Sequence, residues 1–274
     1  RVLALAEKAA PDAVETTLVK ADYLFSLGQA EDALVLLRQI TEKHPKVAGL
    51  WLAQINGLNR LGKTEEALKL IDVGTKAAGE NAGFRTAKAY LYLMRGEYRS
   101  ARAVLTEGLE RVPSEQRATI WKSLGELYQG RSDVLSARKA FLEWANLNKD
   151  SVEPHLALLN LAVSVGDFDR MRESVDTLKS IAGTSSLYWK IARAELLLQE
   201  KPPAGGAKEP AEAARLDELT RLTKEIRTAV PRQPAGYVLE ARVFERQGRI
   251  DDAIANYQNA LDLRGGQIAL RPLV

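Results

Sequence analysis

The chain has 274 residues, 46% of them hydrophobic, as expected of a folded protein. Its 39 lysines and arginines against 36 acidic residues leave a formal charge of +3, too small to indicate nucleic-acid binding by itself. The absence of cysteine excludes disulfides, thiolate metal sites and cysteine nucleophiles, and no apolar run approaches the roughly 18 residues that predict a membrane span.

Residues 14–47 have the pattern of two amphipathic helices joined by a tight turn. Leu18 and Ala21 belong to an apolar stripe at helical spacing, and a second stripe follows Gly28. Glycine accepts the left-handed backbone of a tight turn, and Pro45 cannot continue the second helix. The segment therefore predicts a helix, a turn, a second helix and a stop.

The same unit recurs with a period of 34 residues. The turn glycines Gly28, Gly62 and Gly96 keep this spacing, as do Ala33, Ala67 and Ala101. A fixed period of this size indicates a repeat array. The predicted repeats are 14–47, 48–81, 82–115, 118–151, 152–185, 186–233 and 234–267, with partial repeats at 1–13 and 268–274.

The sixth repeat is interrupted by residues 201–213, KPPAGGAKEPAEA. Three prolines and two glycines in this run are incompatible with a continuous helix and typical of a flexible loop. We therefore expect an insertion between the two helices of that repeat.

The fourth repeat identifies the family that the array resembles. Its motif residues are Trp121, Leu124, Gly125, Tyr128, Ala137 and Phe141. This spacing is similar to the tetratricopeptide repeat pattern Trp-x2-Leu-Gly-x2-Tyr followed by Ala-x3-Phe, with Lys149 in place of the terminal proline. The resemblance implies an all-α fold, a right-handed α-solenoid of about seven stacked helix-turn-helix repeats. It also implies a binding scaffold rather than an enzyme.

Residues 57–64, GLNRLGKT, match the phosphate-binding pattern GxxxxGK[ST]. That loop requires a preceding β-strand, so that its backbone N–H groups can surround a phosphate. Here the motif follows a helical stripe that includes Trp51 and Ile55, which places Gly57 inside a helix. We therefore interpret the match as a coincidence of the helical repeat.

Few other residues suggest a catalytic or metal-binding site. His44 is expected at a helix end, and His155 occupies the position of Trp51 and Trp121 in other repeats, as a packing substitution. Neither has an acidic partner at zinc-ligand spacing, and the acidic pairs after turn glycines suit helix N-termini. We predict no catalytic residue, no metal, no cofactor and no small-molecule substrate.

In proteins of the resembled family, the first helix of each repeat lines a concave groove that binds peptide segments. Residues on this face that are not expected in the core are the candidate partner-binding residues. They are Asp22, Asn56, Asn59, Arg60, Tyr90, Lys122, Glu126, Asn160, Trp189, Arg193, Arg242 and Arg246, with Phe25 and Met94 beside them. The amides of Asn56 and Asn160 can hydrogen-bond both N–H and C=O of a bound backbone. The alternative for each residue is an ordinary solvated helix face.

The family's clamp for a C-terminal carboxylate is disfavoured. Its lysine and asparagine would fall at Leu18 and Asp22, or at Leu52 and Asn56, and neither pair supplies the lysine. The arginines of the sixth and seventh repeats could instead bind an acidic segment through paired donors.

The leading hypothesis is a non-enzymatic protein–protein interaction scaffold, as a fragment of a larger bacterial protein in the cytoplasm or periplasm. The alternative is a regulatory or substrate-docking region of a larger enzyme or of an export or assembly protein. A helical-repeat RNA binder is a third possibility, against which the balanced charge and the missing base-reading pair argue.

Overall fold

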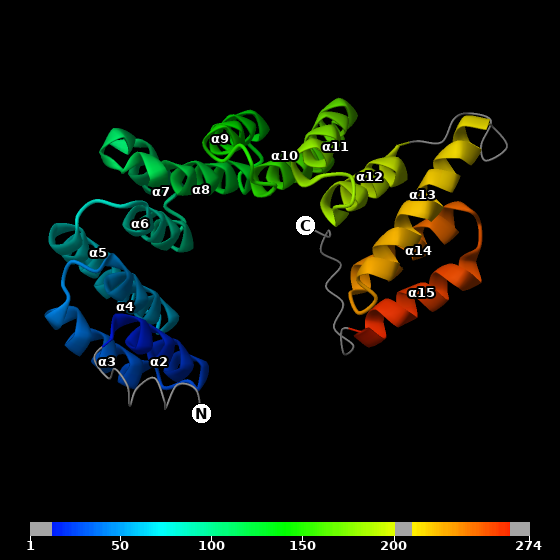
Figure 1. The fold of residues 1–274 in the computed structure, drawn as a ribbon. Coiled ribbons are helices and arrows are strands. Elements are labelled where there is room, and N and C mark those ends of the chain that lie inside the picture. The colour runs from blue at the N-terminus through cyan, green and yellow to red at the C-terminus, as the bar shows by residue number, and fades with distance from the viewer. Residues whose placement is uncertain (1–12, 201–209, 264–274) are drawn as a thin grey trace. The chain divides into compact units, whose positions relative to one another are not determined.

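The computed structural model describes residues 13–200 and 210–263. Fourteen α-helices in these residues follow one another in consecutive pairs, which confirms the predicted all-α helical-repeat fold (Figure 1). The chain divides into two compact units, Arg1–Leu147 and Asn148–Val274, here called the N-terminal and C-terminal units. Each unit is described by itself.

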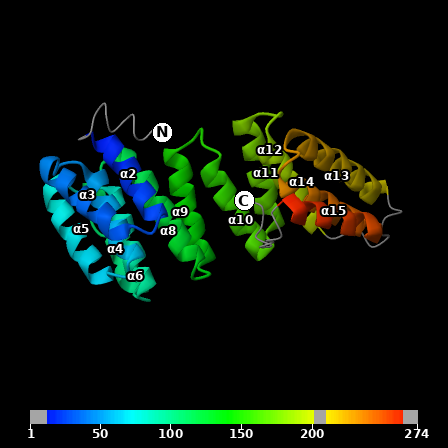
Figure 2. The same ribbon diagram turned by 90° about the horizontal axis from the view of Figure 1, so that it is seen from below.

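The N-terminal unit contains four helix pairs. They are α2 (Val14–Ser26) with α3 (Ala30–Lys43), α4 (Ala48–Arg60) with α5 (Thr64–Ala78), α6 (Ala82–Met94) with α7 (Tyr98–Thr106), and α8 (Arg117–Gln129) with α9 (Val134–Leu147). The first helices also pack against one another in the order α2, α4, α6, α8. They therefore form one layer, and the second helices pack outside it, as Figure 2 shows for α2 beside α3 and α4 beside α5.

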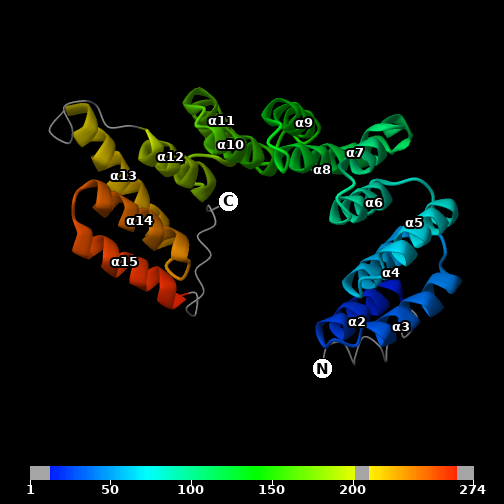
Figure 3. The same ribbon diagram turned by 180° about the vertical axis from the view of Figure 1, so that it is seen from behind.

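The C-terminal unit contains three pairs. They are α10 (Glu153–Val165) with α11 (Phe168–Ala182), α12 (Leu187–Gln199) with α13 (Pro210–Ala229), and α14 (Pro234–Arg246) with α15 (Ile250–Leu263). Helix α14 lies between α13 and α15 in both Figure 1 and Figure 3, and it also packs against α12. The first helices of this unit are α10, α12 and α14.

Small residues allow the two helices of a pair to approach closely. Ala21, Ala89, Ala192 and Ala241 are all buried in the first helices. Gly125 is the tightest position, since a Cβ there would lie 2.2 Å from Cε1 of Phe141 on α9. Their burial places these small residues at the contact between paired helices.

The turn between paired helices uses a left-handed residue. Gly28, Gly62 and Gly96 have φ of +76°, +73° and +77°, as the glycine spacing predicts. The fourth repeat differs, because Gly130 has φ of −61° and Ser132 takes the left-handed position with φ of +59°. A serine there is strained, since its Cβ crowds the neighbouring carbonyl.

The third repeat departs from the predicted helix-turn-helix-stop pattern. Helix α7 ends at Thr106, well before Pro113, and two 3-10 turns follow, η1 (Leu109–Arg111) and η2 (Ser114–Gln116). Gly108 breaks the helix in the left-handed conformation. The side chain of Arg85 reaches the freed carbonyl groups, donating to Val104 O at 3.0 Å, to Glu107 O, and to Gly108 O at 3.1 Å.

The predicted loop 201–213 lies largely outside the described residues. Its last part is helical, because α13 begins at Pro210, and proline is accommodated in the first turn of a helix. The partial repeats expected at 1–13 and 268–274 also lie outside the described residues, apart from Ala13.

Candidate functional site

A hollow of about 510 Å³ lies on the first-helix layer of the N-terminal unit, here called the N-terminal hollow. It is formed by α4, α6 and α8, with Leu105 from α7. Three predicted groove residues line it, one from each first helix: Asn56, Tyr90 and Glu126. All three side chains are exposed. Its remaining walls include the buried residues Ala89, Leu105 and Leu127.

These three residues belong to one repeating position. Each stands six residues before the left-handed turn residue of its repeat, and the same holds for Asp22, Asn160 and Arg242. The position faces away from the paired second helix, because its members are exposed or half-buried although their neighbours are core. Its side chains change from repeat to repeat: aspartate, asparagine, tyrosine, glutamate, asparagine and arginine. Such variation is what a ligand-reading position would have.

Two further candidates come together at the start of the array. The guanidinium of Arg60 lies 5.2 Å from the ring centroid of Phe25 and 4.0 Å from Oδ1 of Asp22. The predicted residues of repeats one and two are therefore neighbours in space. Asn59, in the same turn of α4, is half-buried.

Lys122 and Glu126 do not act as a pair. The Nζ atom of Lys122 lies 5.3 Å from the ring centroid of Trp144 on α9, a cation–π contact within the repeat. Glu126 has no ion pair or side-chain hydrogen bond within residues 13–200 and 210–263. It is the one charged residue among those lining the N-terminal hollow.

A second hollow, of about 480 Å³, lies on the first helices of the C-terminal unit and is here called the C-terminal hollow. It is formed by α10, α12 and α14. Two predicted residues, Asn160 and Arg242, line it together with the apolar side chains of Leu156, Val163 and Ile191. A mostly apolar cavity with a few polar groups is typical of a binding pocket.

The charge of Arg242 is compensated inside this hollow. Its Nη1 atom donates to Oε1 and Oε2 of Glu195 at 2.7 and 2.8 Å, across from α14 to α12. The pair is partly exposed at the wall of the cavity. The C-terminal hollow is therefore close to neutral as well as apolar.

Three other candidates are engaged in packing and capping. Trp189 donates from Nε1 to Thr184 O at 3.0 Å and packs against two core clusters. Arg193 forms two hydrogen bonds with Glu218 on α13, at 3.0 and 2.9 Å, and these raise the pKa of its guanidinium. Arg246 donates to the carbonyl groups of Leu197, Leu198 and Glu200, at the end of α12.

Several residues that line the hollows are not among the groove residues predicted from the sequence. In the C-terminal hollow these are Tyr188, Ile191, Glu195 and Gln199, which occur at steps of three and four residues along α12. That helical stripe was visible in the sequence. Trp189 could also have been excluded as a groove residue, since it stands 34 residues after His155, a position already assigned to packing.

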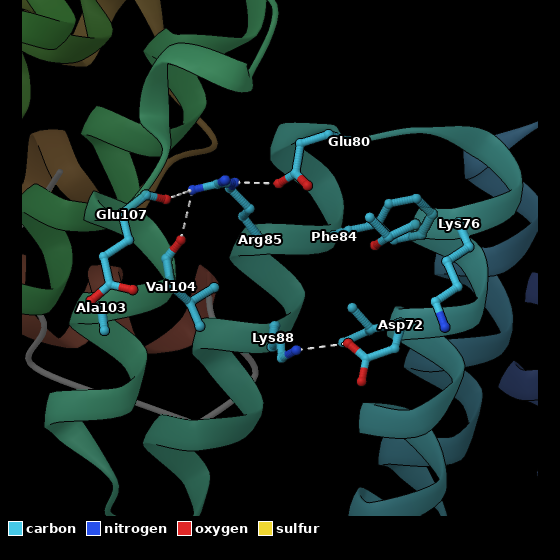
Figure 4. Close-up of a pocket in the computed structure, with 11 residues that line it drawn as sticks. Asp72, Lys76, Glu80, Phe84, Arg85, Lys88, Ala103, Val104 and Glu107 are labelled. Carbon is cyan, nitrogen blue, oxygen red and sulfur yellow. Dashed lines mark hydrogen bonds and ion pairs between the residues drawn. The ribbon is translucent and has the colours of Figure 1, made fainter.

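A third hollow, of about 510 Å³, opens between α5, α6 and α7 and therefore involves the second-helix layer. Figure 4 shows Arg85 between Glu80 on one side and the carbonyl groups of Val104 and Glu107 on the other. Arg85 is buried, its Nε lies 2.5 Å from Oε1 of Glu80, and Lys88 lies 2.7 Å from Asp72. Four of the charged side chains that line this hollow are therefore paired with one another.

The other sequence motifs have structural explanations. Gly57 lies inside α4, and its Cβ would collide with the ring of Phe25, so GLNRLGKT has the predicted helical context. His44 ends α3, as predicted, and burial lowers the pKa of His155. The described residues contain no cluster of three potential metal ligands. No helix among them is long and apolar enough to cross a membrane.

Comparison with known families supports the repeat interpretation. Residues 18–82 and 86–151 match the family described as Tetratricopeptide repeat. No curated protein matches the sequence.

Solved structures of repeat proteins have a similar fold. A tetratricopeptide repeat protein from Parabacteroides merdae aligns with a TM-score of 0.54 at 19% identity, over 91% of this chain and 92% of that one. Pseudomonas aeruginosa PilF aligns with a TM-score of 0.51 at 15% identity, over 83% and 96%. Yeast Tom70 aligns with a TM-score of 0.62 at 16% identity, over 90% of this chain and 49% of Tom70. At these identities the likeness concerns the fold alone.

Proposed function

We propose that the chain, in which residues 18–82 and 86–151 match the tetratricopeptide repeat family, is a non-enzymatic scaffold that binds a peptide segment of another protein on its first helices. The observation that carries the proposal is the position of the two hollows. The C-terminal hollow is formed by first helices, and the N-terminal hollow by first helices and Leu105 of α7. Both are lined by the variable position six residues before the turn. Cavities of a few hundred Å³ are large enough for one or two side chains of a bound segment.

The C-terminal hollow suits a bulky apolar side chain of the partner. Its walls contain Leu156, Val163 and Ile191, and its one arginine is compensated by Glu195. Burying an aliphatic or aromatic side chain there would contribute about 1.5–3 kcal/mol. Asn160, at the edge, can hydrogen-bond the backbone of the same segment through its amide.

The N-terminal hollow suits the main chain of an extended segment. Asn56 is exposed and makes no side-chain hydrogen bond to the described residues, so both its amide N–H and its carbonyl oxygen are available. An amide of this kind can pair with both polar groups of a peptide unit without regard to its side chain. Asp22, Arg60 and Asn59 would extend the same surface toward the start of the array.

The remaining predicted groove residues would act indirectly. Arg193 and Arg246 are bound to other parts of the C-terminal unit, and Trp189 packs against its core, so we assign these residues to the shape of the surface. Lys122 is held over Trp144 and would contribute at the margin. We also propose that the array consists of the seven repeats with the boundaries predicted from the sequence.

The test is affinity capture with the wild type and with Asn56→Ala/Asn160→Ala. The matched control is Asn146→Ala/Asn259→Ala, which removes two exposed amides from the second helices α9 and α15. We expect the first double variant to lose partner proteins that the control retains. Equal recovery by both variants and the wild type would contradict binding on the first helices.

A further inference from the structure

We propose that the N-terminal hollow binds a lysine or arginine side chain of the partner segment, with Glu126 as its counter-ion. The inference rests on the proposed function, and it adds the charge of the residue that this part of the surface selects. It is the opposite of the acidic partner that the arginines of the sixth and seventh repeats suggest from sequence alone.

The first observation is the charge of the hollow. Glu126 is exposed, and it is the one charged side chain among the lining residues. On the same helix, Lys122 could serve as a counter-ion for Glu126, but its ammonium group lies over the ring of Trp144 instead. An uncompensated carboxylate beside a cavity favours a cationic group of a ligand.

Cations on the neighbouring helices are also engaged. On α4, Arg60 lies over Phe25 and near Asp22. On α6, Lys88 lies 2.7 Å from Asp72, and Arg95, which follows that helix, lies 2.5 Å from Glu65. Since each has a partner on the protein, Glu126 keeps its negative charge available.

The second observation is the apolar lining of the same hollow. Leu105 and Leu127 are buried, while Leu93 and Tyr90 are 40% and 51% exposed in the same hollow. Lysine and arginine combine an apolar stem with a charged head, so the stem can cover these residues while the head reaches Glu126. The exposed ring of Tyr90 can in addition hold the cation against its face.

The third observation concerns the hydrogen-bonding groups around the hollow. Asn56 on α4 and Ser123 on α8 line it with Glu126 and make no side-chain hydrogen bond to the described residues. They can hold the partner's main chain and fix which side chain enters the cavity. A peptide with a basic residue flanked by ordinary backbone therefore fits the hollow better than an acidic or wholly apolar one.

The test is selection from a random peptide display library by the whole chain. Wild type is compared with Glu126→Gln, Glu126→Lys and the control Glu42→Gln, which removes an exposed carboxylate from α3 in the second-helix layer. We expect wild type and control to enrich peptides that share one lysine or arginine position. Glu126→Gln should bind these peptides about twofold to fivefold more weakly, because an exposed ion pair is worth up to about 1 kcal/mol.

Charge reversal gives the sharpest readout. Glu126→Lys should move the enriched residue from basic to acidic at that position. If peptides are enriched without a basic residue, or if the three Glu126 forms select the same peptides, the inference is wrong while peptide binding stands. If no protein enriches any peptide, the proposed peptide-binding function fails together with it.

Discussion

Gly125 on α8 lies directly against the ring of Phe141 on α9, with no room for a side chain between the helices. A Cβ on Gly125 would meet Cε1 and Cδ1 of that ring at 2.2 and 2.3 Å. Both residues are buried, so neither can move into solvent. The close approach of α8 and α9 therefore depends on the absence of a Cβ atom at Gly125.

Gly125→Ala should destabilise the protein. Forcing a methyl group into a filled core costs about 1–3 kcal/mol, which exceeds the gain of about 1 kcal/mol from the better helix propensity of alanine. Urea unfolding followed by circular dichroism would measure the change. The matched control is Gly49→Ala in α4, where the added Cβ would contact only Cδ1 of Leu18, at 3.9 Å. That variant should be neutral or slightly stabilising, and equal losses in both would contradict the packing argument.

Ser132→Gly should stabilise the protein. Ser132 holds φ of +59° in the turn between α8 and α9, where glycine occupies the corresponding place in repeats one to three. Relief of this strain is worth about 1 kcal/mol. Thermal unfolding would detect a gain of that size as a higher Tm.

Two alanine variants provide the comparison for that turn. Gly96→Ala places a side chain at φ of +77° and should lower stability by about 1 kcal/mol. Gly130→Ala lies at φ of −61° and should be tolerated. If Gly130→Ala proved the more damaging of the two, the left-handed residue of the fourth repeat would not be Ser132.

Arg85→Met should destabilise the end of α7. Arg85 is buried and bonds the carbonyl groups of Val104, Glu107 and Gly108. Without the guanidinium, these carbonyl groups and Glu80 lose their hydrogen-bond donor. We expect this loss to lower the free energy of unfolding by about 2–3 kcal/mol. Urea unfolding would measure the total loss, and amide hydrogen exchange should rise first around Thr106. The control Arg99→Met changes an exposed arginine of α7 and should lie within about 0.5 kcal/mol of the wild type.

The fold was predictable because the core residues recur at a fixed spacing and each repeat is a continuous stretch of the sequence. The positions of Ala33, Ala67 and Ala101 recur at a fixed period and are all buried. The irregular third repeat was less visible, because the break after Thr106 depends on Arg85. That residue stands 34 positions after Trp51, so an arginine replaces the usual tryptophan.

The candidate site was only partly predictable, for a different physical reason. Sequence spacing shows which face of a helix a residue lies on, but contacts with distant residues decide whether it is available. Arg193 is bound by Glu218 and Arg246 by the end of α12, and neither partner is near in sequence. Glu126 and Lys122 are equivalent candidates in the sequence, yet only Glu126 lines the hollow.

Tyr257 should make stability fall at alkaline pH. Burial, together with the hydrogen bond from its hydroxyl to Oε2 of Glu245 at 2.9 Å, raises the pKa of Tyr257 from the ordinary 10.0 to about 12. The folded state therefore favours the neutral phenol. This contribution is fully present below about pH 10, the unfolded pKa, and is lost as the pH rises toward about 12.

The expected loss is about 1 kcal/mol, because solvent around the partly exposed group reduces the effect of a two-unit shift. Urea unfolding at pH values on either side of this window should show a steeper decline for the wild type than for Tyr257→Phe. Absorbance titration of the phenols should show one group fewer ionising near pH 12 in that variant. The control Tyr23→Phe removes a phenol that is 54% exposed, and its stability should follow the wild-type decline. A Tyr257→Phe variant that declines as steeply as the wild type would rule out this residue as the origin of the pH dependence.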